Sequence, residues 1–164
     1  MSLPLHLSIH IALSLFACFL AFKITRKPIF SFFFALLAGV AVDFDHFIDY
    51  FMAFGWNFNL HYFENGYQFL KSDKIYILFH AWEYVIIFIV IAFFIKSNLI
   101  KAIFWGLALG LFFHLSADCM LNEGMKPQAY SVVYRIENNF DVKNLVTSEH
   151  YKKHIEQKET VSFE

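Results

Sequence analysis

The sequence predicts an all-α membrane protein, a bundle of four transmembrane helices. Hydrophobic residues make up 59% of the 164 residues and charged residues only 16%, a balance too apolar for an ordinary soluble domain. Four apolar stretches each reach the roughly 20 helical residues that a bilayer core requires. None shows the alternating pattern of barrel strands, so we interpret all four as helices.

The four predicted spans cover residues 3–22, 29–54, 76–95 and 100–121. They define a transmembrane domain at 1–121, followed by a tail at 122–164. The tail contains six Lys or Arg and seven Asp or Glu, with an apolar patch at 129–134. This pattern is typical of a short interfacial helix followed by a solvated end, and a mobile terminus is the alternative.

Basic residues without any acidic residue occupy two of the predicted connections: Lys23, Arg26 and Lys27 in the first, and Lys96 and Lys101 in the third. The positive-inside rule places both connections in the cytoplasm. Both termini and the second connection, 55–75, are then predicted to lie on the extracytoplasmic side. The net charge of −1 and the absence of a nucleic-acid motif give no indication of a nucleic-acid partner.

Every predicted span carries ionisable residues near its extracytoplasmic end. They are His6 and His10 in the first, Asp43, Asp45, His46 and Asp49 in the second, His80 and Glu83 in the third, and His114 and Asp118 in the fourth. A charged side chain at the centre of a spanning helix costs about 2.5 to 3.5 kcal/mol on insertion scales. Ten such residues at one depth therefore indicate a functional site.

Helical spacing places several of these residues on shared faces: His6 with His10 and His114 with Asp118 are four apart, and His80 with Glu83 are three apart. In the second span, Asp45, His46 and Asp49 form a tighter group than Asp43 does. We therefore expect four ligand-bearing helix edges that face one centre.

Imidazole and carboxylate ligands favour zinc, with manganese and iron as alternatives, and two cysteines are too few for a structural thiolate site. The number of candidate ligands allows one or two ions. The principal candidates are Asp45, His46, His80, His114 and Asp118. His10 and Asp49 are open to a packing role alone, and Glu83 to a role as ligand, general base or partner of His80.

The sequence resembles a known family in the order of its motifs. HLSIH at 6–10, VDFDH at 42–46, His80 and HLSADCMLN at 114–122 resemble the membrane-bound, predicted metal-dependent hydrolases whose bacterial prototype is LexA-regulated. The resemblance implies a bacterial or archaeal cytoplasmic membrane protein with a distant similarity to zinc-dependent phospholipase C. It also implies these metal-site residues: His6, Asp43, Asp45, His46, His80, His114 and Asp118.

Two positions depart from the family pattern. Val42 replaces the proline that precedes the first aspartate of the family's second motif. The third motif is reduced to FHAWEY at 79–84, which keeps His80 but has Ile75 where another His would fall. One expected ligand is therefore missing, and Glu83 is placed to replace it.

The predicted chemistry is hydrolysis of a lipid or a lipid-linked ester or phosphoester. A bound divalent metal lowers the pKa of water from about 15.7 toward 7 and polarises the oxygen of the scissile group. A carboxylate that does not bind the metal, Asp43 or Glu83, would accept the proton from water. Membrane lipids are the expected partners, and the sequence specifies no protein partner.

Three other classes of protein are alternatives to a hydrolase. A non-catalytic scaffold or assembly protein could use the metal for stability alone, and a membrane di-iron oxidoreductase would use similar ligands. A metal or proton transporter would need a polar path to the cytoplasmic side. The segments 14–22 and 85–95 contain no charged residue, which disfavours a transporter.

Overall fold

The computed structural model describes residues 3–122 and 124–162, and the chain divides into two compact units. The first unit consists of Met1–Asp43 and Phe79–Leu121, and the second of Phe44–Leu78 and Asn122–Glu164. Within the described residues, regular structure is entirely helical apart from two isolated β-bridges. The predicted all-α class is therefore confirmed.

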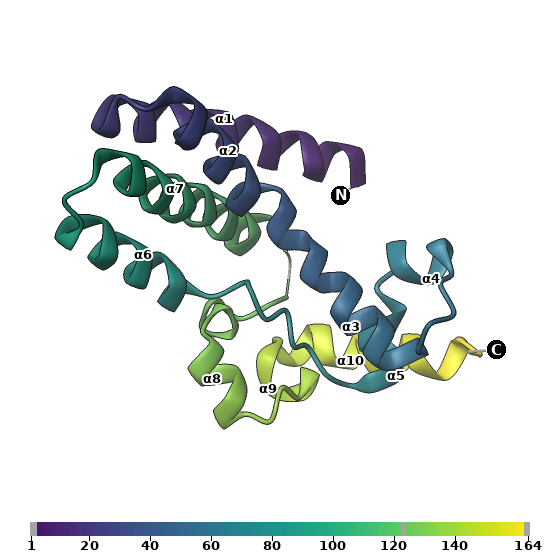
Figure 1. Ribbon diagram of the computed structural model, residues 1–164. Coiled ribbons are helices and arrows are strands. Elements are labelled where there is room, and N and C mark those ends of the chain that lie inside the picture. Colours follow the sequence, from purple (N-terminus) through teal and green to yellow (C-terminus); the bar gives the residue numbers. More distant parts are fainter. Residues whose placement is uncertain (1–2, 123, 163–164) are drawn as a thin grey trace. The chain divides into compact units, whose positions relative to one another are not determined.

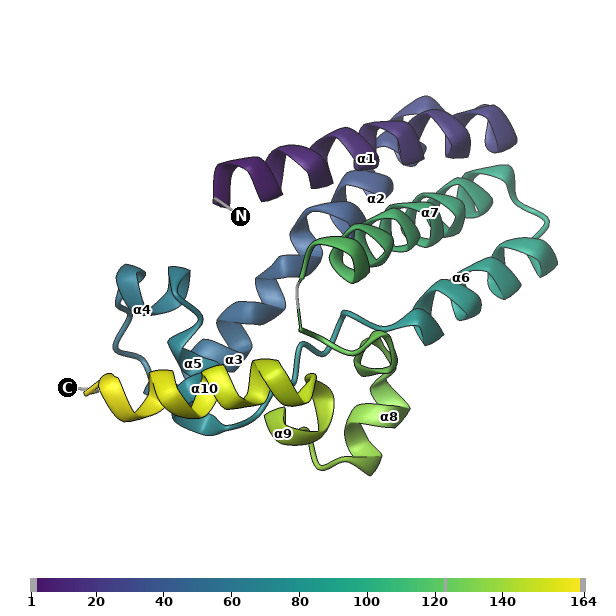
Figure 2. The same cartoon turned by 180° about the vertical axis from the view of Figure 1, so that it is seen from behind.

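The first unit contains two helical hairpins, α1 (Leu3–Thr25) with α2 (Pro28–Gly39) and α6 (Trp82–Phe94) with α7 (Asn98–Leu121). Helix α7 packs against the other three (Figures 1 and 2). The short connections within the hairpins favour antiparallel neighbours. Both connections lie at the same end of this unit (Figure 1), and the side of the membrane on which they lie stays a prediction.

Helices α1 and α7 are long and apolar enough to cross a membrane. The number of candidate spans rises to three if Pro28–Gly39 and Ala41–Phe54 count as one broken span. Helix α6 has 13 residues and is about 20 Å long, shorter than a bilayer core of about 30 Å. Helices long and apolar enough to cross a membrane are therefore present, whereas a bundle of four spanning helices is not confirmed.

Small residues bring α2 and α7 into close backbone contact. Ser31, Ala35 and Gly39 repeat every four residues along α2 and face Gly106 and Gly110 of α7. A Cβ atom on Gly110 would overlap the carbonyl oxygen of Ala35, and one on Gly106 would lie 3.1 Å from the Ala35 backbone nitrogen. This arrangement is the small-xxx-small packing by which membrane helices associate in the absence of a hydrophobic driving force.

The predicted second span is interrupted. Helix α2 ends at Gly39, a 3-10 turn η1 occupies Ala41–Phe44, and α3 runs over Asp45–Phe54. The carbonyl oxygen of Gly39 accepts a hydrogen bond from the ring of His114 at 3.1 Å. A side chain that donates a hydrogen bond to a backbone carbonyl in this way is a common cause of a break in the helical hydrogen-bond ladder.

Helix α3 has the reverse of the polarity found in a helix on a soluble protein. Its acidic residues Asp45 and Asp49 are buried, whereas Ile48 and Met52 are exposed, as is Phe44 directly before it. Acidic groups inside and apolar groups outside suit a helix surrounded by lipid. The pattern supports the broken-span interpretation of α2 and the segment that follows it.

The start of the predicted third span is not helical, because its backbone groups have other partners. The two carboxylate oxygens of Asp49 accept hydrogen bonds from the backbone N–H groups of Tyr76 and Ile77, at 2.8 and 2.9 Å. The carbonyl oxygen of Ile77 accepts a hydrogen bond from the buried guanidinium of Arg135 at 3.1 Å. These contacts give the backbone groups of the segment partners outside a helix before α6 begins.

The late start of α6 corrects one prediction. Because the helix begins at Trp82, His80 precedes it and does not share a helix face with Glu83. The predicted pairing by i,i+3 spacing was therefore wrong.

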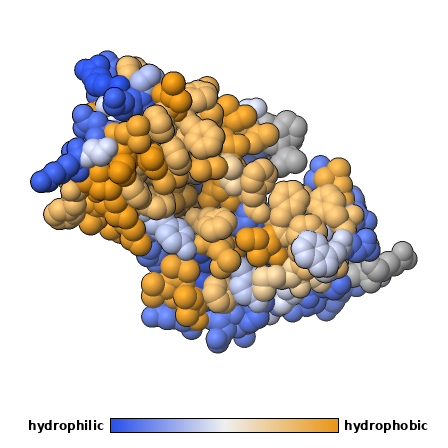
Figure 3. Space-filling view, viewed as in Figure 1, coloured by the Kyte–Doolittle hydropathy of each residue, from blue (hydrophilic) through white to orange (hydrophobic). Residues whose placement is uncertain are grey.

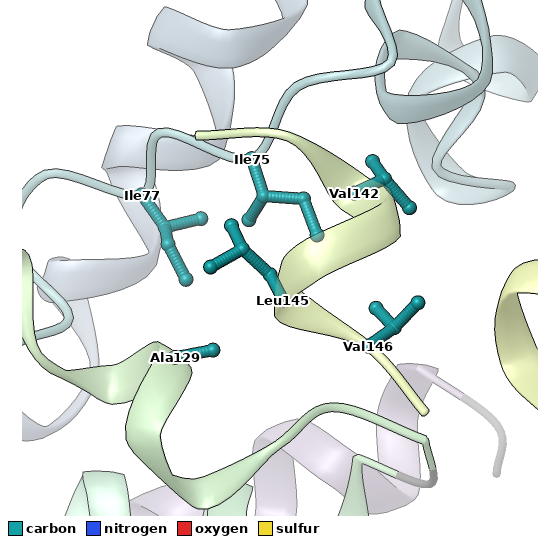
Figure 4. Close-up of a cluster of buried hydrophobic side chains, with 6 residues drawn as sticks. All are labelled: Ile75, Ile77, Ala129, Val142, Leu145 and Val146. Atoms are coloured by element: carbon teal, nitrogen blue, oxygen red, sulfur yellow. The ribbon is translucent and has the colours of Figure 1, made fainter. Parts of the chain in front are cut away.

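The second unit gathers short helices around a small apolar core. The helices are α3, α4 (Leu60–Glu64), α5 (Tyr67–Ser72), η2 (Pro127–Tyr130), α8 (Val132–Glu137), α9 (Val142–Leu145) and α10 (Ser148–Thr160). Its core contains Ile75, Ile77, Ala129, Val142, Leu145 and Val146 (Figure 4). The tail thus packs with residues 44–78 in one unit, and the apolar patch at 129–134 falls on η2 and α8.

An ionic contact holds the last helix against α5. Asp73, at the end of α5, accepts hydrogen bonds from His154, at 3.0 Å, and from Lys158, both on α10. Burial raises the pKa of Asp73, but the bonds from His154 and Lys158 outweigh burial and hold the pKa below its usual value. The carboxylate of Asp73 is therefore the charged centre of this contact.

The contact between α2 and α7 predicts that Gly110→Ala destabilises the protein by about 1 to 3 kcal/mol, because the new methyl group overlaps the Ala35 backbone. Thermal unfolding of the detergent-solubilised protein would measure this loss. Ser116→Ala, at a half-buried position of the same helix, is the matched control. A Gly110→Ala variant as stable as the control would contradict the packing described.

The Asp73 contact predicts that Asp73→Asn increases hydrogen exchange in α10, with a loss of up to about 1 kcal/mol because the side chain is half exposed. In the unmodified protein the stabilisation is present above the unfolded pKa of about 3.9 and is lost as the pH falls through the lower folded value. Glu149→Gln is the control, since Glu149 pairs with Lys153 within α10. Unchanged exchange in Asp73→Asn would rule out the contact.

Candidate metal centre

One face of α7 carries both the glycines that pack against α2 and two of the candidate ligands. Gly106, Gly110, His114 and Asp118 follow one another at intervals of four and lie on the same face of the helix. The glycines allow the close approach of α2, and the next two turns place His114 and Asp118 in the interior, where 1% and 2% of their surfaces are exposed. The predicted pairing of His114 with Asp118 is therefore present on one face.

The first group of ligand atoms joins α1 to α7. The Nε2 atoms of His6 and His10 lie 2.8 Å apart, and Oδ1 of Asp118 lies 3.2 Å from His10 Nε2 and 3.8 Å from His6 Nε2. His10 is fully buried, whereas His6 is partly exposed. These three atoms lie close enough to one another to hold one metal ion.

The second group uses the other carboxylate oxygen of Asp118. Oδ2 lies 3.2 Å from His114 Nε2 and 3.5 Å from His80 Nε2, and the two Nε2 atoms are 3.0 Å apart. His80 is buried and stands in the segment before α6. This group, too, could hold a metal ion.

Asp43 lies beside the second group. Its Oδ1 is 3.2 Å from Nε2 of His80 and 3.4 Å from Nε2 of His114. The Asp43 side chain is 29% exposed, whereas that of Asp118 is 3% exposed. Asp43 is therefore the carboxylate of the cluster that water can reach more easily.

The tautomer of His114 leaves its Nε2 atom able to bind a cation. Because the carbonyl of Gly39 can only accept, Nδ1 of His114 carries the proton that is donated to it. In the neutral ring, Nε2 then has a lone pair directed at the carboxylate oxygens of Asp43 and Asp118. Lone pairs at these distances repel one another unless a proton or a metal ion lies among them, and a fixed tautomer of this kind is usual in metal-binding histidines.

The spacing of the atoms fits a metal ion. Zinc-to-nitrogen and zinc-to-oxygen bonds of about 2.0 to 2.2 Å in a tetrahedron put neighbouring ligand atoms about 3.3 Å apart. The distances within the two groups run from 2.8 to 3.8 Å and bracket that value. The cluster around His80 and Asp118 could therefore hold a metal ion, although its geometry does not select one element.

Comparison with known proteins adds no relative. No protein-family model matches the chain. Searches of curated proteins and of solved structures return no match either. The resemblance to LexA-regulated membrane hydrolases therefore stays a prediction.

Within the first unit, six of the ten predicted residues lie close together: His6, His10, Asp43, His80, His114 and Asp118. Asp45, His46 and Asp49 belong to α3 in the second unit. Asp45 is buried, His46 is half-buried with its ring against Phe69, and Asp49 binds the backbone at 76–77. Glu83 is half-buried in the first turn of α6, outside the groups of ligand atoms in the described part of the chain.

Two contributors escaped the sequence analysis. The carbonyl of Gly39 fixes the His114 ring, and a backbone group of this kind leaves no mark in a sequence. Gly106 and Gly110, which allow α7 to pack closely against α2, could have been found in the sequence. A glycine pair at this spacing in an apolar helix is typical of a helix contact.

The geometry predicts that zinc stabilises the purified protein against heat, by about 2.7 kcal/mol when free zinc is 100 times its dissociation constant. The stabilisation should fall strongly in a variant that carries both His114→Ala and Asp118→Ala, because the two groups that contain Asp118 both lose ligand atoms. Differential scanning calorimetry would measure it. His61→Ala, on the exposed surface of α4, is the control and should respond as the wild type does.

Proposed function

We propose that the protein is a membrane-embedded, metal-dependent hydrolase that acts on a lipid or a lipid-linked ester or phosphoester. The observation that carries this proposal is the convergence of six His and Asp side chains in an apolar helical unit. Four neighbouring imidazoles and two carboxylates would be costly there without a cation or a reaction to serve. The same residue types support zinc, manganese or iron.

The cluster contains the parts that metal-assisted hydrolysis requires. His80, His114 and Asp118 would hold an ion by three protein ligands, and catalytic sites of this kind leave further positions for water and substrate. When bound, the metal supplies a lowered pKa for water and polarises the oxygen of the scissile group. Asp43, the more exposed carboxylate, is placed to take the proton from water.

The surface around the cluster favours an amphiphilic substrate. Leu5 and Leu7, on either side of the partly exposed His6, are 53% and 41% exposed. The visible surface of the first unit is largely hydrophobic (Figure 3). A lipid could therefore keep its acyl chains against this surface while its ester or phosphate group reaches the ligands.

Asp43→Asn is predicted to lower kcat by about 10² to 10⁴, the usual contribution of a general base, while metal content is retained. Full-length protein in lipid nanodiscs, loaded with zinc or manganese, would be tested on phosphoesters and carboxyl esters of lipids. Release of the headgroup or fatty acid gives the rate, and His61→Ala serves as control. A metal-loaded protein without hydrolytic activity on either class would overturn the proposal.

An oxidative reaction is the second candidate, and one observation favours it. Each group of ligand atoms consists of two imidazoles and one carboxylate oxygen, the set that non-haem iron oxygenases use. An iron-loaded protein that consumes oxygen in the presence of lipid, and does not hydrolyse it, would replace the hydrolase by this alternative.

A further inference from the structure

Asp118 is shared by the two groups of ligand atoms, but each group uses a different one of its oxygens. Oδ1 lies 3.2 Å from His10 and 3.8 Å from His6, whereas Oδ2 lies 3.2 Å from His114 and 3.5 Å from His80. The four imidazoles are thus divided into two pairs, each next to a different oxygen of one buried carboxylate. A single ion would leave one of these pairs without a metal.

Each pair is itself spaced like ligands of one ion. The Nε2 atoms are 2.8 Å apart in the pair of His6 and His10, and 3.0 Å apart in the pair of His80 and His114. The rings of His10 and His114 stack with their centroids 4.1 Å apart, which joins the two pairs without merging them. A pair of imidazoles therefore lies near each of the two Asp118 oxygens. A site for one ion would explain only one of these pairs.

We infer that the centre binds two divalent ions bridged by Asp118, one held by His6 and His10 and the other by His80 and His114. A bridging carboxylate holds ions at the separation of about 3.5 to 4 Å that two-metal hydrolytic sites use. This inference rests on the proposed metal centre and deepens it.

Charge then selects the substrate within the proposed class. Two divalent ions bring four positive charges, and the carboxylates of Asp43 and Asp118 offset two of them. The remaining charge in an apolar unit favours an anionic group that can bridge both ions. A lipid phosphoester meets this condition, whereas a neutral carboxyl ester does not.

Metal stoichiometry tests the inference directly. Full-length protein in detergent, stripped with a chelator and reloaded with zinc or manganese, should contain two ions per chain by inductively coupled plasma mass spectrometry. The double variant His6→Ala with His10→Ala should keep one ion, and so should His80→Ala with His114→Ala. His61→Ala, outside the cluster, should keep two.

Asp118→Asn removes the shared carboxylate with little change of shape, and it should weaken binding of both ions together. Gel filtration and circular dichroism would show that each variant is folded. Orthophosphate should bind to the two-ion protein and not to either one-ion variant.

The outcomes separate this inference from the proposed function. One ion per chain in a protein that hydrolyses lipid would overturn the two-ion centre and leave the hydrolase intact. Two ions per chain in a protein that hydrolyses no lipid would overturn the hydrolase and leave the two-ion centre intact. An Asp118→Asn variant that loses only one ion would overturn the bridge.

Discussion

The contact between α2 and α7 is the constraint on which the candidate centre depends. Glycine at 106 and 110 lets the α7 backbone touch the α2 backbone near Ala35. The same face of α7 continues to His114, whose ring reaches the carbonyl at the end of α2. That single register fixes the His114 ring, interrupts the helix at Gly39 and brings Asp43 to the histidines. A shift of one residue would turn the ligands toward lipid.

Burial explains why the cluster calls for a cation. His10, His114 and Asp118 have almost no contact with solvent. A buried carboxylate costs folding free energy unless it is paired. Each nitrogen of a neutral imidazole either donates a hydrogen to the carboxylate or faces it with another lone pair. The fixed tautomer of His114 offers the lone pair. A proton would relieve the repulsion at one contact, but a divalent metal relieves it at several at once, which is why the geometry favours a metal.

The sequence predicted the parts that depend on apolar length and helical period. It located the helices of the first unit, except for the break after α2 and the start of α6, and it paired His6 with His10 and His114 with Asp118 correctly. It could not predict contacts in which a backbone group replaces a helical partner. The carboxylate of Asp49 holds the backbone at 76–77, so the helix predicted from residue 76 begins at Trp82. Composition also could not reveal that residues 44–78 pack with the tail, because that unit is built from long-range contacts.

X-ray absorption spectroscopy of the zinc-loaded or manganese-loaded full-length protein would test the metal centre, because it reports the atoms around the metal. We expect a shell of nitrogen and oxygen at about 2.0 to 2.2 Å, with imidazole scattering and a second metal at about 3.5 to 4 Å. A shell that contains sulfur, or one of oxygen alone without imidazole, would contradict a centre built from His6, His10, His80, His114 and Asp118.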